Sequence, residues 1–232
     1  MLAFDEFRQT LTPEQQERVC MVMHTEPVQE HGTDLPTFIE HCMPDSKVIF
    51  VPDKFNEEEL NYLYNMADVT INLASNEGFG LATAESVMAG TPIIVNVTGG
   101  LQDQCGFKID GKYVTAEDYV KIGSLHDWRK FEDKVTYGEW VTPLWARAQT
   151  MQGSVPTPYI IDDKVDIYEL ADAFKEWYDV PKEERKQMGL KGREYFLSED
   201  GFYAKRMCDK MIEGIEQGFA NWKPRKRYDL FK

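Results

Sequence analysis

The sequence predicts an α/β fold in which a Rossmann-like parallel sheet is flanked by helices, interrupted by an irregular insert and closed by three C-terminal helices. Three observations carry this prediction. Strand-like and helix-like runs alternate over the first hundred residues, a glycine-rich segment joins one strand to the next helix, and three helix-like runs end the chain. Alternation of this kind is typical of βαβ units, which assemble into parallel sheets.

Short runs rich in apolar and β-branched residues are the expected strands. They lie at residues 18–23, 47–51, 68–73 and 92–97, and Tyr159–Ile161 is the expected last strand. Helices are expected between them, at residues 2–7, 36–42, 56–67 and 80–89. Asn56 is a typical helix start because three glutamates follow it, and Gly90 is a typical helix end.

The second half of the chain is organised differently. Residues 101–158 show little periodicity and include five glycines, so we expect an irregular insert or a lid there. Three helices follow, at roughly residues 166–178, 181–196 and 202–221. We divide the chain into a Rossmann-like domain at residues 1–200 and a C-terminal helix with a basic tail at residues 201–232.

The composition excludes several classes of function. The chain has 232 residues, of which 42% are hydrophobic, and a formal net charge of −14. It can bury one good core, and its negative charge makes nucleic acid an unfavourable partner. No apolar run has the length of a transmembrane segment, no signal peptide is visible, and four widely spaced cysteines are typical of reduced thiols. We therefore expect a cytoplasmic protein.

The segment with the strongest chemical signal is residues 72–85, which joins the end of a strand to the start of a helix. Ligands of open parallel sheets bind outside the carboxyl ends of the strands. Gly78 and Gly80 let the backbone approach a ligand closely, and the helix start offers free N–H groups to a phosphate. Glu77 in the loop and Glu85 in the helix can bind hydroxyl groups on either side of that phosphate.

A nucleotide-sugar has that layout, with phosphates between two hydroxyl-rich groups. The alternative is a tight strand-to-helix turn whose acidic residue favours the helix dipole. The segment matches neither the dinucleotide-binding GxGxxG pattern nor the P-loop.

Residues 77–85 resemble a known motif. Glu77-Gly78-Phe79-Gly80-Leu81, with Glu85 eight residues after the first glutamate, is similar to the E-x7-E signature of retaining glycosyltransferases with the GT-B fold, most like family 4. The flanking residues 63–69 and 89–94 and the pair Gly99–Gly100 also resemble that family, in the same order along the chain.

The resemblance implies that this chain is the C-terminal, donor-binding half of a GT-B enzyme, with its first strand missing. Glu77 would then contact the sugar as the catalytic residue, and Glu85 would bind the ribose. The amides of residues 78–81 would contact the sugar and phosphates, and Lys54, Phe55 and Leu60 would lie near the base. The donor would be a nucleotide-diphosphate sugar, with no cofactor and no metal.

Several functions remain open at this point. The first is a hexosyltransferase-like enzyme that acts with retention, represented here by an inactive fragment that lacks the N-terminal acceptor domain. The second is a non-catalytic module that binds nucleotide-sugars without an acceptor domain, and a third is another GT-B enzyme, such as an epimerase. The basic tail at residues 223–227 is expected to be solvated, or to contact phosphate or the missing domain.

Overall fold

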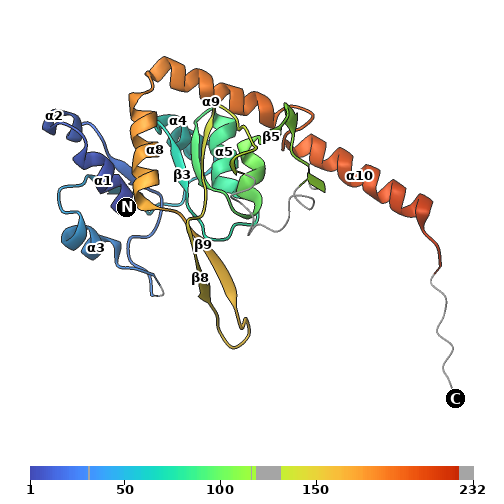
Figure 1. Ribbon diagram of the computed structural model, residues 1–232, viewed down its shortest axis with the longest axis horizontal. Helices are drawn as coiled ribbons and strands as arrows, with labels where there is room; N and C mark the ends of the chain where they lie inside the picture. Colours follow the sequence, from blue (N-terminus) through green and yellow to red (C-terminus); the bar gives the residue numbers. More distant parts are fainter. Residues whose placement is uncertain (31, 116, 119–131, 225–232) are drawn as a thin grey trace. The chain divides into compact units, whose positions relative to one another are not determined.

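The computed structural model describes residues 1–30, 32–115, 117–118 and 132–224 of the chain (Figure 1). It divides into two compact units, residues 1–193 and 194–232. The sequence-based boundary after residue 200 falls inside the second unit. Most of the expected basic tail, Arg225–Arg227, lies outside the described residues.

Parallel strands form the centre of the first unit, and this confirms the predicted fold class. β1 (Met21–Met23) pairs in parallel with β2 (Val48–Phe50). A second sheet has the order β3 (Thr70–Asn72), β4 (Ile93–Asn96) and β7 (Val141–Leu144), again with parallel pairs. All four residues of β4 are buried, so this strand is the centre of the core.

The two sheets are consistent with one doubly wound arrangement. In the strand order 3-2-1-4-5-6, the first strand lies between the second and the fourth. The described strands match this order in the following way. β1 and β2 take positions two and three, and β3, β4 and β7 take positions four, five and six. This assignment leaves position one unfilled in the described part of the chain.

Two strand predictions need correction. β7 lies within residues 101–158, so this insert is not wholly irregular. Pro143 interrupts the apolar run of β7, and a proline is tolerated there because β7 is an edge strand of its sheet. Tyr159–Ile161 does not add the last parallel strand. It leads into β9 (Ile160–Lys164), which pairs in antiparallel register with β8 (Ala148–Gln152). A short apolar run does not reveal the direction of its partner.

The described residues between β4 and β7 form two further elements. A 3₁₀ helix, η1 (Gly99–Cys105), follows β4, and a short hairpin consists of β5 (Lys108–Ile109) and β6 (Lys112–Tyr113). The expected insert or lid is therefore partly ordered structure, and its residues Leu101, Cys105 and Phe107 are buried.

The helices agree well with the predictions. They are α1 (Leu2–Gln9), α2 (Pro13–Gln16), α3 (Leu35–Cys42), α4 (Glu57–Met66), α5 (Leu81–Ala89), α8 (Ile167–Asp179), α9 (Lys182–Phe196) and α10 (Ala204–Asn221). Asn56 accepts hydrogen bonds from two amides of α4 in a capping box, and Gly90 ends α5 in the left-handed conformation. The short α2 was not predicted.

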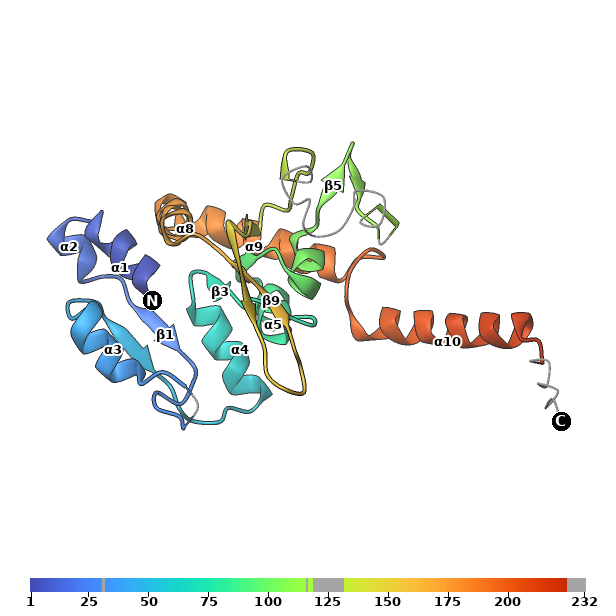
Figure 2. The ribbon, with the colours of Figure 1, turned by 60° about the horizontal axis from the view of Figure 1, so that its bottom comes forward.

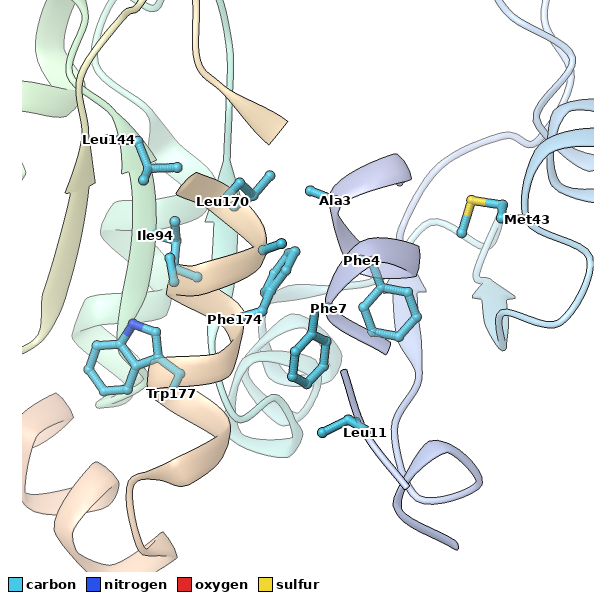
Figure 3. Close-up of a cluster of buried hydrophobic side chains, with 12 residues drawn as sticks. Ala3, Phe4, Phe7, Leu11, Met43, Ile94, Leu144, Leu170, Phe174 and Trp177 are labelled. Atoms are coloured by element: carbon cyan, nitrogen blue, oxygen red, sulfur yellow. The ribbon is translucent and has the colours of Figure 1, made fainter. Parts of the chain in front are cut away.

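One hydrophobic core joins the helices to both sheets. Phe4 and Phe7 of α1 lie against Phe174 of α8, with ring centroids 6.1 Å and 5.8 Å apart (Figure 3). Ile94 of β4 belongs to the same buried cluster, and Met21 of β1 packs against it. The core therefore fixes β4, whose carboxyl end leads into the candidate site.

Candidate functional site

The candidate site begins where β3 and β4 end. The Asn72 side chain accepts a hydrogen bond from the Ala74 N–H at 3.0 Å, and Asn96 donates its amide to the Ala74 carbonyl at 2.9 Å. Each asparagine is the last residue of its strand. The two strand ends thus fix the start of the loop that runs from Leu73 to Gly80.

The glycine pair after β4 supports this loop by close backbone packing. The Gly100 N–H donates to the Glu77 carbonyl at 3.0 Å. A Cβ atom on Gly99 would lie 1.9 Å from the Glu77 carbonyl oxygen, and one on Gly100 would lie 2.4 Å from the Gly78 oxygen. Both positions therefore require glycine, and the pair that the resemblance identified has a physical role in holding the turn.

Gly80 is the residue on which the loop becomes helix α5. Its φ of +89° lies in the left-handed region, and a Cβ atom there would lie 2.4 Å from a methyl group of Leu101. The Gly80 carbonyl accepts hydrogen bonds from the Ala84 N–H and the Thr83 hydroxyl, both at 3.0 Å. No side chain caps α5, and Leu81 is 70% exposed, so the helix start reaches the surface.

A buried glutamine that the sequence analysis missed lies behind the turn. The Gln104 amide nitrogen donates to the Phe79 carbonyl at 2.6 Å and to the Gly80 carbonyl at 3.0 Å. Its own backbone carbonyl accepts a hydrogen bond from the Trp140 indole at 3.1 Å. Gln104 is completely buried. The only signal in the sequence was a polar residue a few positions after a glycine pair, which is too common to interpret.

The two acids of the predicted motif lie on this turn and on the helix that follows. Glu77 is half-buried and Glu85 is exposed on α5. The Tyr64 hydroxyl, from the neighbouring helix α4, donates to a Glu85 carboxylate oxygen at 2.9 Å. Burial and this hydrogen bond raise the pKa of Tyr64 above its usual value. Tyr64 therefore stays a neutral donor and orients Glu85.

The three residues expected near a base lie at the ends of β2 and α4. Lys54 is exposed, and Phe55 is half-buried with its ring stacked on His24, at a centroid distance of 5.0 Å. His24 itself is fixed by a contact of 2.8 Å between its Nε2 and the Asp53 carbonyl oxygen. Leu60 lies one turn before Tyr64 on α4, on the same helix face. His24 follows the carboxyl end of β1, and Lys54 and Phe55 follow the carboxyl end of β2.

The hairpin β8–β9 meets the site at its base, which the sequence did not indicate. The Asn76 amide donates to Asp162 at 2.7 Å, and the Lys164 ammonium donates to the Ser75 hydroxyl at 2.9 Å. Thr98 donates to Asp163 at 3.0 Å. Both views show the hairpin extending away from the three-stranded sheet (Figures 1 and 2). Its base therefore borders the residues immediately before Glu77.

A small hollow of about 190 Å³ lies beside β7 and the start of α8. Its Arg147 guanidinium forms paired hydrogen bonds with both Glu132 and Glu169, at 2.7–3.0 Å. Two carboxylates neutralise one cation there, so the hollow has no surplus positive charge for an anionic ligand. The turn of residues 77–85 therefore stays the candidate site, because it combines backbone N–H groups with two carboxylates.

Part of the chain is similar to known glycosyltransferases. Residues 6–119 match the family described as "Glycosyl transferases group 1", and this segment includes the whole turn. A stretch of 87 residues is 35% identical to an uncharacterized glycosyltransferase from Methanocaldococcus jannaschii; the match covers 35% of this chain and 22% of that protein. No helix among the described residues is long and apolar enough to cross a membrane.

Two solved structures resemble the chain over most of its length. An α,α-trehalose-phosphate synthase (UDP-forming) from Burkholderia xenovorans, in complex with glucose-6-phosphate, has a TM-score of 0.51 and 12% identity. The similarity covers 93% of this chain and 40% of the synthase, and at this identity it shows the fold alone. The synthase from Burkholderia vietnamiensis has a TM-score of 0.49 and 13% identity, over 93% of this chain and 42% of that one. The chain thus spans less than half the length of the proteins it matches.

Proposed function

We infer from the glycosyltransferase group 1 domain at residues 6–119 that this chain binds the donor of a sugar-transfer reaction. The donor is a nucleotide-sugar, which the turn of residues 77–85 holds. One observation carries the proposal: an uncapped helix start lies at the surface between two carboxylates of the same strand–turn–helix segment. Phosphate fits the helix start, and hydroxyl groups fit the two acids.

Each predicted residue takes one part of the donor in this proposal. The amides of residues 78–81 bind the sugar and the phosphates. Glu77 contacts the sugar as the catalytic residue, and Glu85, oriented by Tyr64, binds the ribose hydroxyls. A carboxylate has about four acceptor sites, so Glu85 can accept from Tyr64 and from a ribose at the same time. Phe55, with Lys54 and Leu60, forms the wall nearest the base.

The finer features of the reaction are part of the same proposal. The resemblance to family 4 and its E-x7-E motif implies transfer with retention, without a metal or a cofactor. The synthases of similar fold are described as UDP-forming, so UDP and its sugars are the first ligands to test. We further propose a cytoplasmic enzyme that does not bind nucleic acid. The turn of residues 77–85 supplies the donor side of this reaction.

The substitution Glu77→Ala tests the proposal on the chain itself. A residue that touches the sugar but not the nucleotide should weaken binding of a sugar nucleotide more than binding of the nucleoside diphosphate. Calorimetry with both ligands on the wild type and the variant gives the two losses. The matched control is Glu58→Ala, which removes the same charge from the exposed face of α4. Equal losses for both ligands would show that Glu77 does not contact the sugar.

Turnover is measured separately, on a protein that also carries an acceptor domain. There Glu77→Ala should lower the rate, because a carboxylate near the reacting sugar stabilises positive charge that develops in the transition state. A wild-type chain that binds sugar nucleotides while no acceptor domain restores transfer would favour the non-catalytic binding module.

A further inference from the structure

The carbonyl groups of Phe79 and Gly80 both point toward Gln104. The amide nitrogen of Gln104 is 2.6 Å from the first oxygen and 3.0 Å from the second. Two carbonyl acceptors require a nitrogen at this position, which fixes the orientation of the side-chain amide. The amide oxygen, Oε1, is buried without a hydrogen-bond partner among the described residues.

Because the peptide bond is planar, fixing a carbonyl group on one side of the turn also fixes the direction of the N–H group on the other side. In a trans peptide unit the C=O and the following N–H point in opposite directions. When Gln104 holds the Phe79 carbonyl inward, the Gly80 N–H must point away from Gln104. The Gly80 carbonyl likewise fixes the Leu81 N–H, at the exposed start of α5. Gln104 thus sets the direction of the Gly80 N–H. It supports the direction of the Leu81 N–H together with the Ala84 N–H and the Thr83 hydroxyl, which also donate to the Gly80 carbonyl.

We propose that Gln104 is a positioning residue that aims the N–H groups of Gly80 and Leu81 at the phosphates of the donor. The inference rests on the proposed function, since it names how that site recognises a diphosphate. Gln104 does not touch the ligand. It acts through the two peptide planes, so it contributes to the affinity for the phosphates and not to the affinity for the base or the ribose.

The hydrogen bonds of Gln104, and not its packing alone, account for a polar residue at this buried position. A buried polar atom without a partner destabilises the folded protein, and an apolar side chain of the same length would avoid that cost. Gln104 is completely buried and still leaves Oε1 unpaired. The side-chain amide of Gln104 offsets this cost by holding the carbonyls of Phe79 and Gly80, the two residues just before helix α5.

The test compares Gln104→Met with the wild type, because methionine has a similar length and donates no hydrogen bond. Binding of UDP and of uridine is followed by NMR titration of the nitrogen-labelled chain. We expect the variant to bind UDP about tenfold more weakly, the value of one to two lost hydrogen bonds, and uridine unchanged. The Gly80 and Leu81 amide resonances should shift strongly with UDP in the wild type and weakly in the variant.

Two further variants separate positioning from stability. Asn96→Leu is the matched control, since Asn96 is also completely buried with an unpaired amide oxygen, but it holds the Ala74 carbonyl. It should lower the melting temperature and leave the ratio of UDP to uridine affinity unchanged. Gln104→Asn keeps the amide but is too short to reach both carbonyls, so it should lie between the wild type and Gln104→Met.

Two results would overturn the role of Gln104. In the first, Gln104→Met weakens UDP and uridine equally; in the second, it lowers the melting temperature as Asn96→Leu does, with the affinity ratio intact. Should Gln104→Met not fold, the same comparison is made on Gln104→Asn. These failures are distinct from failure of the proposed function, in which the wild type itself binds neither UDP nor any other nucleoside diphosphate.

Discussion

The two ends of the proposed donor site are held very differently. At the phosphate end, three carbonyls of the turn are fixed from behind: Glu77 by Gly100, and Phe79 and Gly80 by Gln104. At the base end, Lys54 is exposed and Phe55 is half-buried against His24. One end is a backbone structure in which Gly80, Gly99 and Gly100 leave no room for a side chain, and the other consists of side chains at the surface.

This difference indicates how affinity and selectivity are divided. A preorganised set of N–H groups binds a phosphate without a cost for ordering the site, so we expect the turn to supply most of the affinity in the proposed site. Exposed side chains can be exchanged without disturbing the core, so they can set the choice of base. The following substitutions test this division, beginning with the largest expected effect.

Gly99→Ala should disrupt the close backbone packing that supports the turn. Its Cβ atom would lie 1.9 Å from the Glu77 carbonyl oxygen at a φ of +47°, so the turn must move. We expect a loss of about 2–4 kcal/mol in the free energy of unfolding, from steric conflict and backbone strain together, with loss of donor binding. The loss is measured by urea denaturation.

Gly111→Ala is the matched control for this substitution. Gly111 also has a positive φ, +77°, but no atom lies within 4 Å of the added Cβ atom. It should lose only about 1 kcal/mol, the cost of the left-handed conformation. If the two variants lose the same stability, the glycine pair does not support the turn by close packing.

Glu85→Gln tests the ribose end of the turn. The loss of a charge-assisted hydrogen bond should weaken binding of nucleoside diphosphates by about 1–3 kcal/mol. Calorimetry measures the change, with a 2′,3′-dideoxy nucleotide as the comparison ligand that cannot make the bond. Unchanged affinity for the ribonucleotide would remove Glu85 from the site.

Tyr64→Phe should give a smaller loss, because the phenol only orients the carboxylate. We expect about 0.5–1.5 kcal/mol for the ribonucleotide and no change for the dideoxy nucleotide. Tyr62→Phe is a close control, since the Tyr62 hydroxyl donates to Glu58 at the same distance of 2.9 Å on the exposed side of α4. An equal effect of the two variants would contradict the orienting role of Tyr64.

Phe55→Leu should have the smallest effect on affinity, because it keeps an apolar side chain and removes only the stacked ring. The loss should stay below about 1 kcal/mol. The ratio of affinities for UDP and a purine diphosphate should change more than either affinity alone. If the variant loses as much as Glu85→Gln for every nucleotide, the base end is not the adaptable part of the site.

The sequence was informative where a signal is local and less so where it depends on a distant partner. Caps and helix spacing predicted α4, α5 and α8 closely, because these signals lie within the helix itself. β7 and the β8–β9 hairpin were not recognised, since pairing direction is set by other parts of the chain. The turn from Glu77 to Leu81 was found from its own residues, whereas its support by Gln104 comes from 23 or more positions away and required the structure.

The tip and the base of the β8–β9 hairpin are held in different ways. Its turn closes on itself through hydrogen bonds between Ser154 and Thr157, and Val155 is 99% exposed. Its base is bonded to Ser75 and Asn76 next to the site. Insertions at the tip should therefore leave the ladder below it in register and the turn of residues 77–85 undisturbed.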